Sequence, residues 1–166
     1  KIVELKGDEN LFNQEYPATA AIAFQTSGED SLIKPALVIK ARKNNITSPY
    51  GCKVGGLDPA RFGDDRTSFM MRQGRKASAL QSWEKKDTME VAGLAVMLIK
   101  QHDLMKMFID VGGLGAGVYD RLMEMGYGDK IVAVNGGEKA LDSERYFNKR
   151  AEMWGDSKDW LADEGG

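Results

Sequence analysis

An apolar run that ends in a carboxylate and then breaks into glycines constrains the fold more than any other stretch of this chain. Residues 106–110 read Lys-Met-Phe-Ile-Asp, and residues 111–117 read Val-Gly-Gly-Leu-Gly-Ala-Gly. A short apolar run bounded by glycines is typical of a buried strand. We therefore predict a strand that delivers Asp110 to the edge of a sheet.

A second acid, Asp58, ends a similar run, because residues 54–58 read Val-Gly-Gly-Leu-Asp. The pattern predicts a strand over 53–58, and two further strands follow it over 67–72 and 76–83. The sequence Gln-Gly-Arg between the last two indicates a tight reversal. These three strands make an antiparallel meander.

The residues after the meander alternate helical and strand patterns. Asp87 or Thr88 caps a helix with apolar residues at helical spacing, and the strand that ends at Asp110 follows. A helix from about 117 to 125, a strand over 131–134 and a long helix capped by Ser143 complete the series. A strand–helix–strand unit places its strands parallel through a right-handed crossover.

This order predicts an α/β fold with a mixed five-stranded sheet, made of the antiparallel meander plus two parallel strands and flanked by helices. That is the ribonuclease H-like arrangement. In it the first strand lies parallel beside the fourth, so Asp58 and Asp110 become neighbours at strand ends about 4.8 Å apart.

Composition agrees with a single domain. With 166 residues, of which 42% are hydrophobic, the chain suffices for one core with an appendage. We expect residues 1–50 to form a linker, with a short helix within 1–33 and a helical turn or a short strand over 36–41, and residues 51–166 to form the domain. Because Lys1 stands in place of an initiator methionine and nothing closes the last helix, we expect a piece of a longer polypeptide.

Charge and cysteine content exclude several classes. The net charge of −2 argues against bulk electrostatic binding of nucleic acid, so contacts with nucleic acid must be local. The single cysteine, Cys52, excludes an internal disulfide and fits a reducing, intracellular compartment. No apolar run reaches the roughly 20 residues of a membrane span.

The paired acids point to a metal site. An aspartate at a strand end is often only a turn residue, but two such acids brought together repel, and a divalent cation converts that repulsion into binding. Oxygen-only ligands select Mg²⁺ or Mn²⁺ over zinc. Asp64 and Asp65 have an acidic turn as their ordinary interpretation, and Asp65 is the better third candidate.

Other candidate residues have structural alternatives. The glycines after Asp110 do not match G-x-G-x-x-G, and either a structural turn or a close approach of a DNA backbone at Gly113 and Gly115 explains them. A basic region around the last helix is by default a solvated face, and it is also where phosphate contacts are expected, from Lys139, Lys149 and Arg150. Seven of the nine methionines are expected to fill the core, namely Met89, Met97, Met105, Met107, Met123, Met125 and Met153.

With these residues in view, the chain resembles the large terminase subunit of tailed bacteriophages, specifically its carboxy-terminal nuclease domain. The resemblance lies in residues 56–67, 108–118 and 148–154, which read GLDPARFGDDRT, FIDVGGLGAGV and NKRAEMW. Upstream, the Asn-Gln-Glu-Tyr-Pro of 13–17 is similar to the segment by which the family's motor domain leads into the nuclease.

The resemblance implies a metal-dependent endonuclease that cuts concatemeric double-stranded DNA during genome packaging in the host bacterial cytoplasm. It implies two metal ions, with Asp58 and Asp110 matching the first two acidic positions of the family. Implied partners are DNA, the portal protein, the small terminase subunit and the amino-terminal motor ATPase of the full-length chain.

Two departures from the family pattern stand out. The family's third acid lies near a later Ser-Pro-Asp-like motif, and the sequence ends before one. No G-x-x-x-x-G-K-[ST] loop occurs, so we expect no ATP hydrolysis from this piece. Two alternatives remain, namely a non-catalytic docking or DNA-binding module of the packaging machine, and another ribonuclease H-like nuclease such as a junction resolvase.

Overall fold

The computed structural model of this chain describes residues 31–60 and 65–163. Residues 46–150 form one compact unit, and the described residues on either side of them belong to a second. The second unit contains α3 (Pro35–Lys43) and nearly all of α6 (Lys149–Ala162). The helical alternative for 36–41 is therefore the correct one, and a proline in the first turn suits the start of α3. No helix in the described ranges combines the length and the apolar character that crossing a membrane requires.

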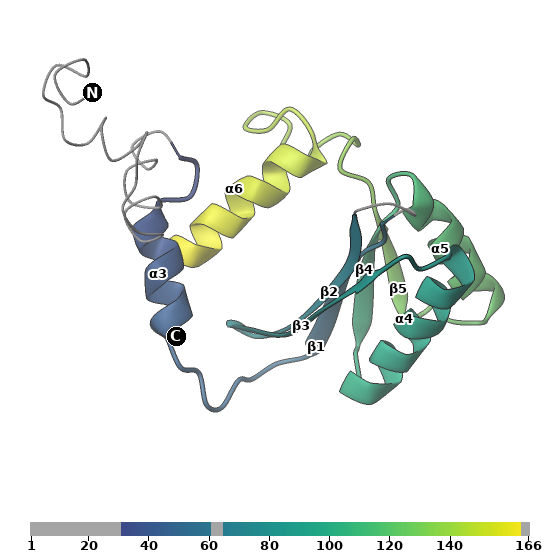
Figure 1. Ribbon diagram of the computed structural model, residues 1–166. Helices are drawn as coiled ribbons and strands as arrows, with labels where there is room; N and C mark the ends of the chain where they lie inside the picture. Colours follow the sequence, from purple (N-terminus) through teal and green to yellow (C-terminus); the bar gives the residue numbers. More distant parts are fainter. Residues whose placement is uncertain (1–30, 61–64, 164–166) are drawn as a thin grey trace, which may run out of the picture. The chain divides into compact units, whose positions relative to one another are not determined.

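The larger unit is built on one mixed sheet with the strand order β3-β2-β1-β4-β5 (Figure 1). β1 pairs antiparallel with β2 and β2 with β3, whereas β1–β4 and β4–β5 are parallel. The predicted ribonuclease H-like sheet is thus confirmed. The strands are β1 (Lys53–Asp58), β2 (Arg66–Gln73), β3 (Lys76–Glu84), β4 (Lys106–Asp110) and β5 (Ile131–Val134).

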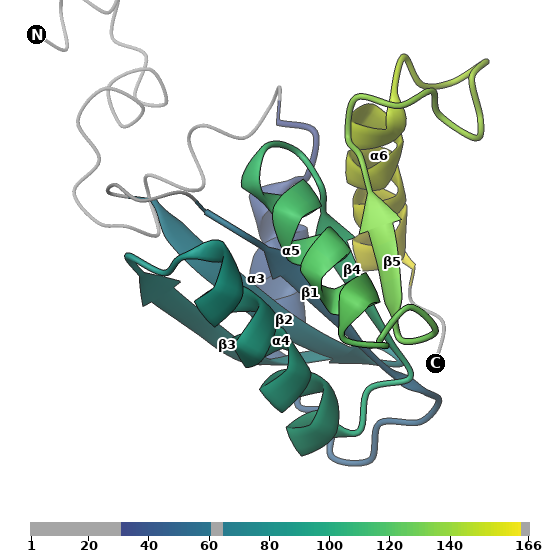
Figure 2. The ribbon, with the colours of Figure 1, turned by 90° about the vertical axis from the view of Figure 1, so that its right-hand side faces the viewer.

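The core lies between this sheet and two helices, α4 (Thr88–His102) and α5 (Leu114–Glu124), which cover the same face (Figure 2). Every second residue of the central strands points into it, as the two-residue period of a strand requires. The fully buried side chains of the sheet and helices include Phe69, Met107, Ile109, Val91, Leu98, Val118 and Leu122.

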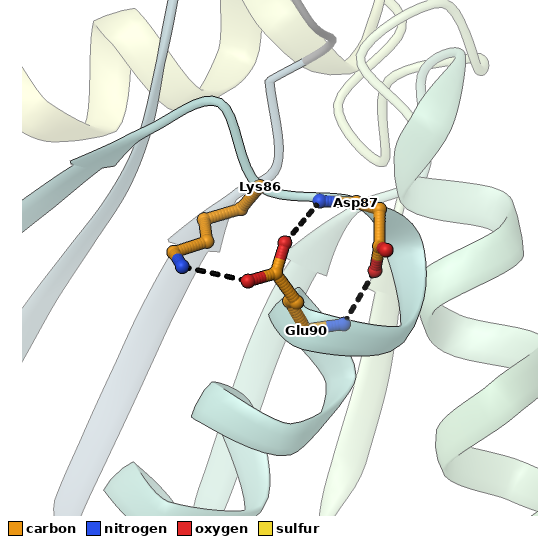
Figure 3. A network of polar contacts seen from close by, with 3 residues as sticks. All are labelled: Lys86, Asp87 and Glu90. Atoms are coloured by element: carbon orange, nitrogen blue, oxygen red, sulfur yellow. Dashed lines mark hydrogen bonds and ion pairs between the residues drawn. The ribbon is translucent and has the colours of Figure 1, made fainter.

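A capping box fixes the start of α4. The Asp87 carboxylate accepts a hydrogen bond from the Glu90 backbone N–H at 2.8 Å, and the Glu90 carboxylate accepts one from the Asp87 N–H at 3.0 Å (Figure 3). Lys86 donates to the other Glu90 oxygen at 2.7 Å. The hydrogen bond from Lys86, followed by that from the Asp87 backbone N–H, lowers the pKa of Glu90. Of the two predicted caps, Asp87 is the one used.

Two helix boundaries were predicted wrongly. α5 begins at Leu114, three residues before the predicted start, because its glycines are needed for packing beside Asp110. The last helix begins at Lys149 and is not capped by Ser143. Residues 142–146 instead form a turn in which the Asp142 carboxylate and carbonyl accept the N–H groups of Arg145 and Tyr146.

The expectation that methionines fill the core is also wrong for most of them. Met107 is fully buried. Six others keep between 40% and 56% of their surface exposed, namely Met89, Met97, Met105, Met123, Met125 and Met153. Helical spacing alone does not separate the buried face of a helix from its outer face when methionine occupies both.

Candidate metal and nucleic-acid site

Parallel pairing of β1 with β4 brings the two predicted acids together. Leu57 pairs with Ile109 at the end of the β1–β4 ladder. The next residues, Asp58 and Asp110, are therefore neighbours at the ends of their strands. Both follow a buried residue and point to the face opposite the core, as alternation along a strand dictates. The predicted neighbourhood of Asp58 and Asp110 is therefore present.

The turn after β4 orients Asp110. The Gly112 backbone N–H donates to Oδ1 of Asp110 at 2.8 Å, which is an Asx turn. A hydrogen bond to one carboxylate oxygen fixes the plane of the group and leaves Oδ2 for a further ligand. Gly112 therefore holds the Asp110 carboxylate in a fixed orientation, with Oδ2 outside this contact.

The start of α5 lies directly against the end of β4. A Cβ at Gly115 would lie 1.7 Å from the Asp110 carbonyl oxygen and 3.5 Å from Pro59 Cγ. Only glycine permits this approach, which joins the ends of β1 and β4 to the first turn of α5. Gly113, at φ +69, occupies a backbone conformation that glycine favours, with open space around it. The close packing is thus a structural requirement at Gly115, while Gly113 combines a turn conformation with open space beside the start of α5.

A buried threonine fixes the position of the chain next to Asp58. Oγ1 of Thr67 accepts a hydrogen bond from the Ala60 N–H at 3.1 Å, and Thr67 is only 2% exposed. This contact fixes the chain just after Asp58 to β2. The sequence analysis had not assigned a role to Thr67, although a hydroxyl on a core-facing strand position is a signal for such a bond.

The negative charges of the carboxylates at the site repel one another. The pKa of Asp58 is raised above its ordinary value, first by partial burial and then by repulsion from Asp110 and from Asp65. Repulsion of this kind shows that Asp65 also lies within electrostatic reach of Asp58. Asp64, whose ordinary interpretation is an acidic turn, lies outside the described residues.

The donor set suits a hard divalent cation. Carboxylate oxygens are the ligands that Mg²⁺, Mn²⁺ and Ca²⁺ take, and a cation relieves the repulsion that raises the pKa of Asp58. Within 31–60 and 65–163, no three acidic, histidine or cysteine side chains gather closely enough to enclose a metal. The described residues thus bring together one pair of candidate ligands, Asp58 and Asp110.

The predicted basic residues lie on the chain that follows β5. Val134 pairs with Asp110, so the segment after it leaves the sheet beside the acids. Lys139 and Arg150 are exposed, and Lys149 is half-buried. The backbone N–H groups of Lys149 and Arg150 donate to the carbonyls of Glu138 and Gly136, at 2.8 and 3.0 Å, which brings the basic residues to the base of one loop.

Comparison with known proteins gives matches by structure alone. No family model matches the sequence, and no curated protein does. The nuclease domain of the large terminase subunit gp2 of bacterial virus Sf6 superposes with a TM-score of 0.68 at 24% identity, over 80% of this chain and 64% of that one.

Two further structures of that Sf6 domain, both of a point variant, give the same result. The one with manganese has a TM-score of 0.66 at 24% identity, and the one with calcium has 0.66 at 25%. Each match covers 80% of this chain, which spans 64% of the length of these relatives. The chain therefore has the ribonuclease H-like fold of the nuclease domain of a phage large terminase subunit.

Proposed function

We propose that this chain is a divalent-metal-dependent DNA endonuclease domain of a phage or prophage large terminase subunit, which cuts concatemeric double-stranded DNA during genome packaging. The observation that carries the proposal is the placement of Asp58 and Asp110 at the ends of adjacent parallel strands. The shared fold with a terminase nuclease domain, studied with manganese and with calcium, supports it.

Asp58 and Asp110 are the residues that would hold the cation. Asp110 would contribute a carboxylate whose Oδ1 is fixed by Gly112, and Asp58 would contribute its carboxylate from the neighbouring strand. Asp65, whose charge contributes to raising the pKa of Asp58, is our candidate for a further ligand. A bound Mg²⁺ or Mn²⁺ supplies acidification of water and neutralisation of phosphodiester charge, and the family resemblance implies two such ions.

The remaining residues would position the DNA. Lys139, Lys149 and Arg150 would supply positive charge from the loop that follows β5 and from its base, and the open backbone at Gly113 gives a phosphate room to approach the start of α5. Gly115 is buried, so its part in DNA contact is indirect, through the position of that first turn. The expected protein partners are the portal protein and the small terminase subunit, together with an amino-terminal motor domain on the same longer chain. The expected location is the host cytoplasm.

The test uses supercoiled plasmid with Mg²⁺ or Mn²⁺. We expect cutting by the chain, and a loss of at least a hundredfold in Asp58→Ala and Asp110→Ala. Asp120→Asn is the matched control, because Asp120 is an exposed acid on α5 away from the strand ends. Undiminished cutting by both alanine variants would overturn the site assignment.

Two further measurements separate the alternatives. Binding of Mn²⁺, followed by electron paramagnetic resonance, should be lost in the same two variants even where cutting is too slow to measure. A preference for four-way junctions over linear duplex would identify a resolvase instead. DNA binding without Mn²⁺ binding or cutting would identify a non-catalytic module.

A further inference from the structure

The loop over residues 135–148 is a closed structure and not a loose connection. Its two ends are joined by the hydrogen bonds from Lys149 to Glu138 and from Arg150 to Gly136. Asp142 organises the middle, since its carboxylate and carbonyl accept the N–H groups of Arg145 and Tyr146 at 3.3 and 3.0 Å. Ala140, 5% exposed, anchors it. A surface loop whose ends meet in this way holds its tip in a defined position.

The loop carries two strongly exposed apolar side chains. Phe147 is 93% exposed and Leu141 is 88% exposed, more than any other large apolar residue in the part of the chain that the structure describes. Burial of an apolar side chain stabilises a fold, and neither residue makes that contribution here. Their exposure on one ordered loop makes this loop a candidate for contact with another molecule.

The surroundings of the loop favour DNA as that molecule. Four cationic residues lie in or at the base of the loop, namely Lys139, Arg145, Lys149 and Arg150, against three acidic ones, Glu138, Asp142 and Glu144, so that the loop and its base carry a net charge of +1. The guanidinium of Arg145 lies 5.1 Å from the ring centre of Tyr146, which orders a cation and an aromatic face next to Phe147. A duplex offers both a charged backbone for the cations and stacked bases for the apolar residues.

The loop also lies where a bound duplex would pass. It begins at Asn135, directly after Val134, and Val134 is the pairing partner of Asp110. In Figure 1 the loop after β5 rises from the edge of the sheet at which β1 also ends. DNA whose phosphodiester lies over Asp58 and Asp110 therefore has this loop beside it.

We infer that Phe147, supported by Leu141, is an apolar wedge that inserts between base pairs of the bound duplex next to the cut, while the basic residues of the loop grip the backbone. The inference rests on the proposed function and adds to it a specificity element. Insertion unstacks one base step and bends the duplex, which is easiest at flexible pyrimidine–purine steps. The wedge therefore makes the choice of cutting position depend on how readily the DNA deforms.

The experiment measures binding of a duplex that carries 2-aminopurine, whose fluorescence rises when its neighbours unstack. The protein is the full chain with Asp110→Asn, so that the DNA stays intact. Phe147→Ala should weaken binding about tenfold and abolish the fluorescence rise, because stacking of a base on an aromatic side chain contributes on that scale. Phe147→Trp should keep both signals.

The matched control is Tyr50→Ala, which removes an aromatic residue that is 69% exposed and lies before the first residue of β1, away from the acids. It should leave binding and fluorescence unchanged. Phe147→Ala should also unfold at the temperature of the parent, since its side chain is exposed, and a lower temperature would disqualify it in favour of Leu141→Ala.

The outcomes separate the wedge from the nuclease. Unchanged affinity and fluorescence in Phe147→Ala, with cutting by the wild type intact, overturn the wedge alone. Absence of duplex binding by every variant overturns the proposed function as well. Retained DNA binding with loss of binding to a packaging protein would make the loop a protein-docking site and would also overturn the wedge.

Discussion

Replacing Gly115 by alanine should destabilise the domain and also displace Asp110. The added Cβ would lie 1.7 Å from the Asp110 carbonyl oxygen and 2.8 Å from its carbonyl carbon. A carbon and an oxygen in contact need about 3.2 Å, so the first turn of α5 or the end of β4 must move by roughly 1.5 Å, a shift typical of overpacked cores.

The expected loss of stability follows from that displacement. Overpacking costs about 3 kcal/mol when backbone must move, and alanine returns about 1 kcal/mol through its higher helix propensity. The net loss of about 2 kcal/mol should lower the melting temperature by roughly 8 °C or more. Differential scanning calorimetry and urea unfolding of the metal-free chain measure it.

Gly93→Ala is the matched control. Gly93 lies in the middle of α4, and a Cβ there meets nothing within 4 Å. The same chemical change should therefore stabilise the chain by about 0.5 to 1 kcal/mol. Gly115→Ala should also bind Mn²⁺ more weakly than Gly93→Ala. A Gly115→Ala chain as stable as the wild type, with equal Mn²⁺ affinity, would refute the argument that this glycine positions Asp110.

Three further predictions concern single contacts. Asp58→Asn should raise the melting temperature in EDTA, by an amount that grows as pH rises above about 4, because the folded state raises the pKa of Asp58 and loses stability once that carboxyl ionises. Thr67→Val should cost about 1 to 2 kcal/mol in urea unfolding, since the Ala60 N–H loses its acceptor, and an unchanged midpoint would contradict this. Asp87→Ala should cost about 1 kcal/mol by removing the cap of α4, and circular dichroism melting measures that loss.

The sheet and the acid pair were predictable because their signals are local. Residues 53–58, 106–110 and 131–134 are apolar runs bounded by turn residues, and they are strands with those bounds. Once the order of elements is known, the handedness of the crossover places β1 beside β4. The neighbourhood of Asp58 and Asp110 then follows from topology without any knowledge of side-chain contacts.

The errors arose where tertiary contacts override local preference. Glycines lower helix propensity, so the sequence predicts a late start for α5, but the close approach at Gly115 requires glycine inside the helix. Ser143 is a good helix cap by type, yet Asp142 one residue earlier captures the N–H groups of the turn. The exposure of Phe147 has no signature in the sequence, because an aromatic residue reads as core until the path of its loop is known.

The pairing of β1 with β4 has a consequence for when the acids come together during synthesis. Asp58 and Asp110 are separated in the chain by the whole meander and by α4, and only the ladder from Val54–Lys106 to Leu57–Ile109 unites them. Contacts between such distant residues form late, since closing long loops costs entropy. A chain still emerging from the ribosome therefore lacks the acid pair at least until β4 has left the ribosome, and Asp58 and Asp110 become neighbours only when β1 and β4 have paired.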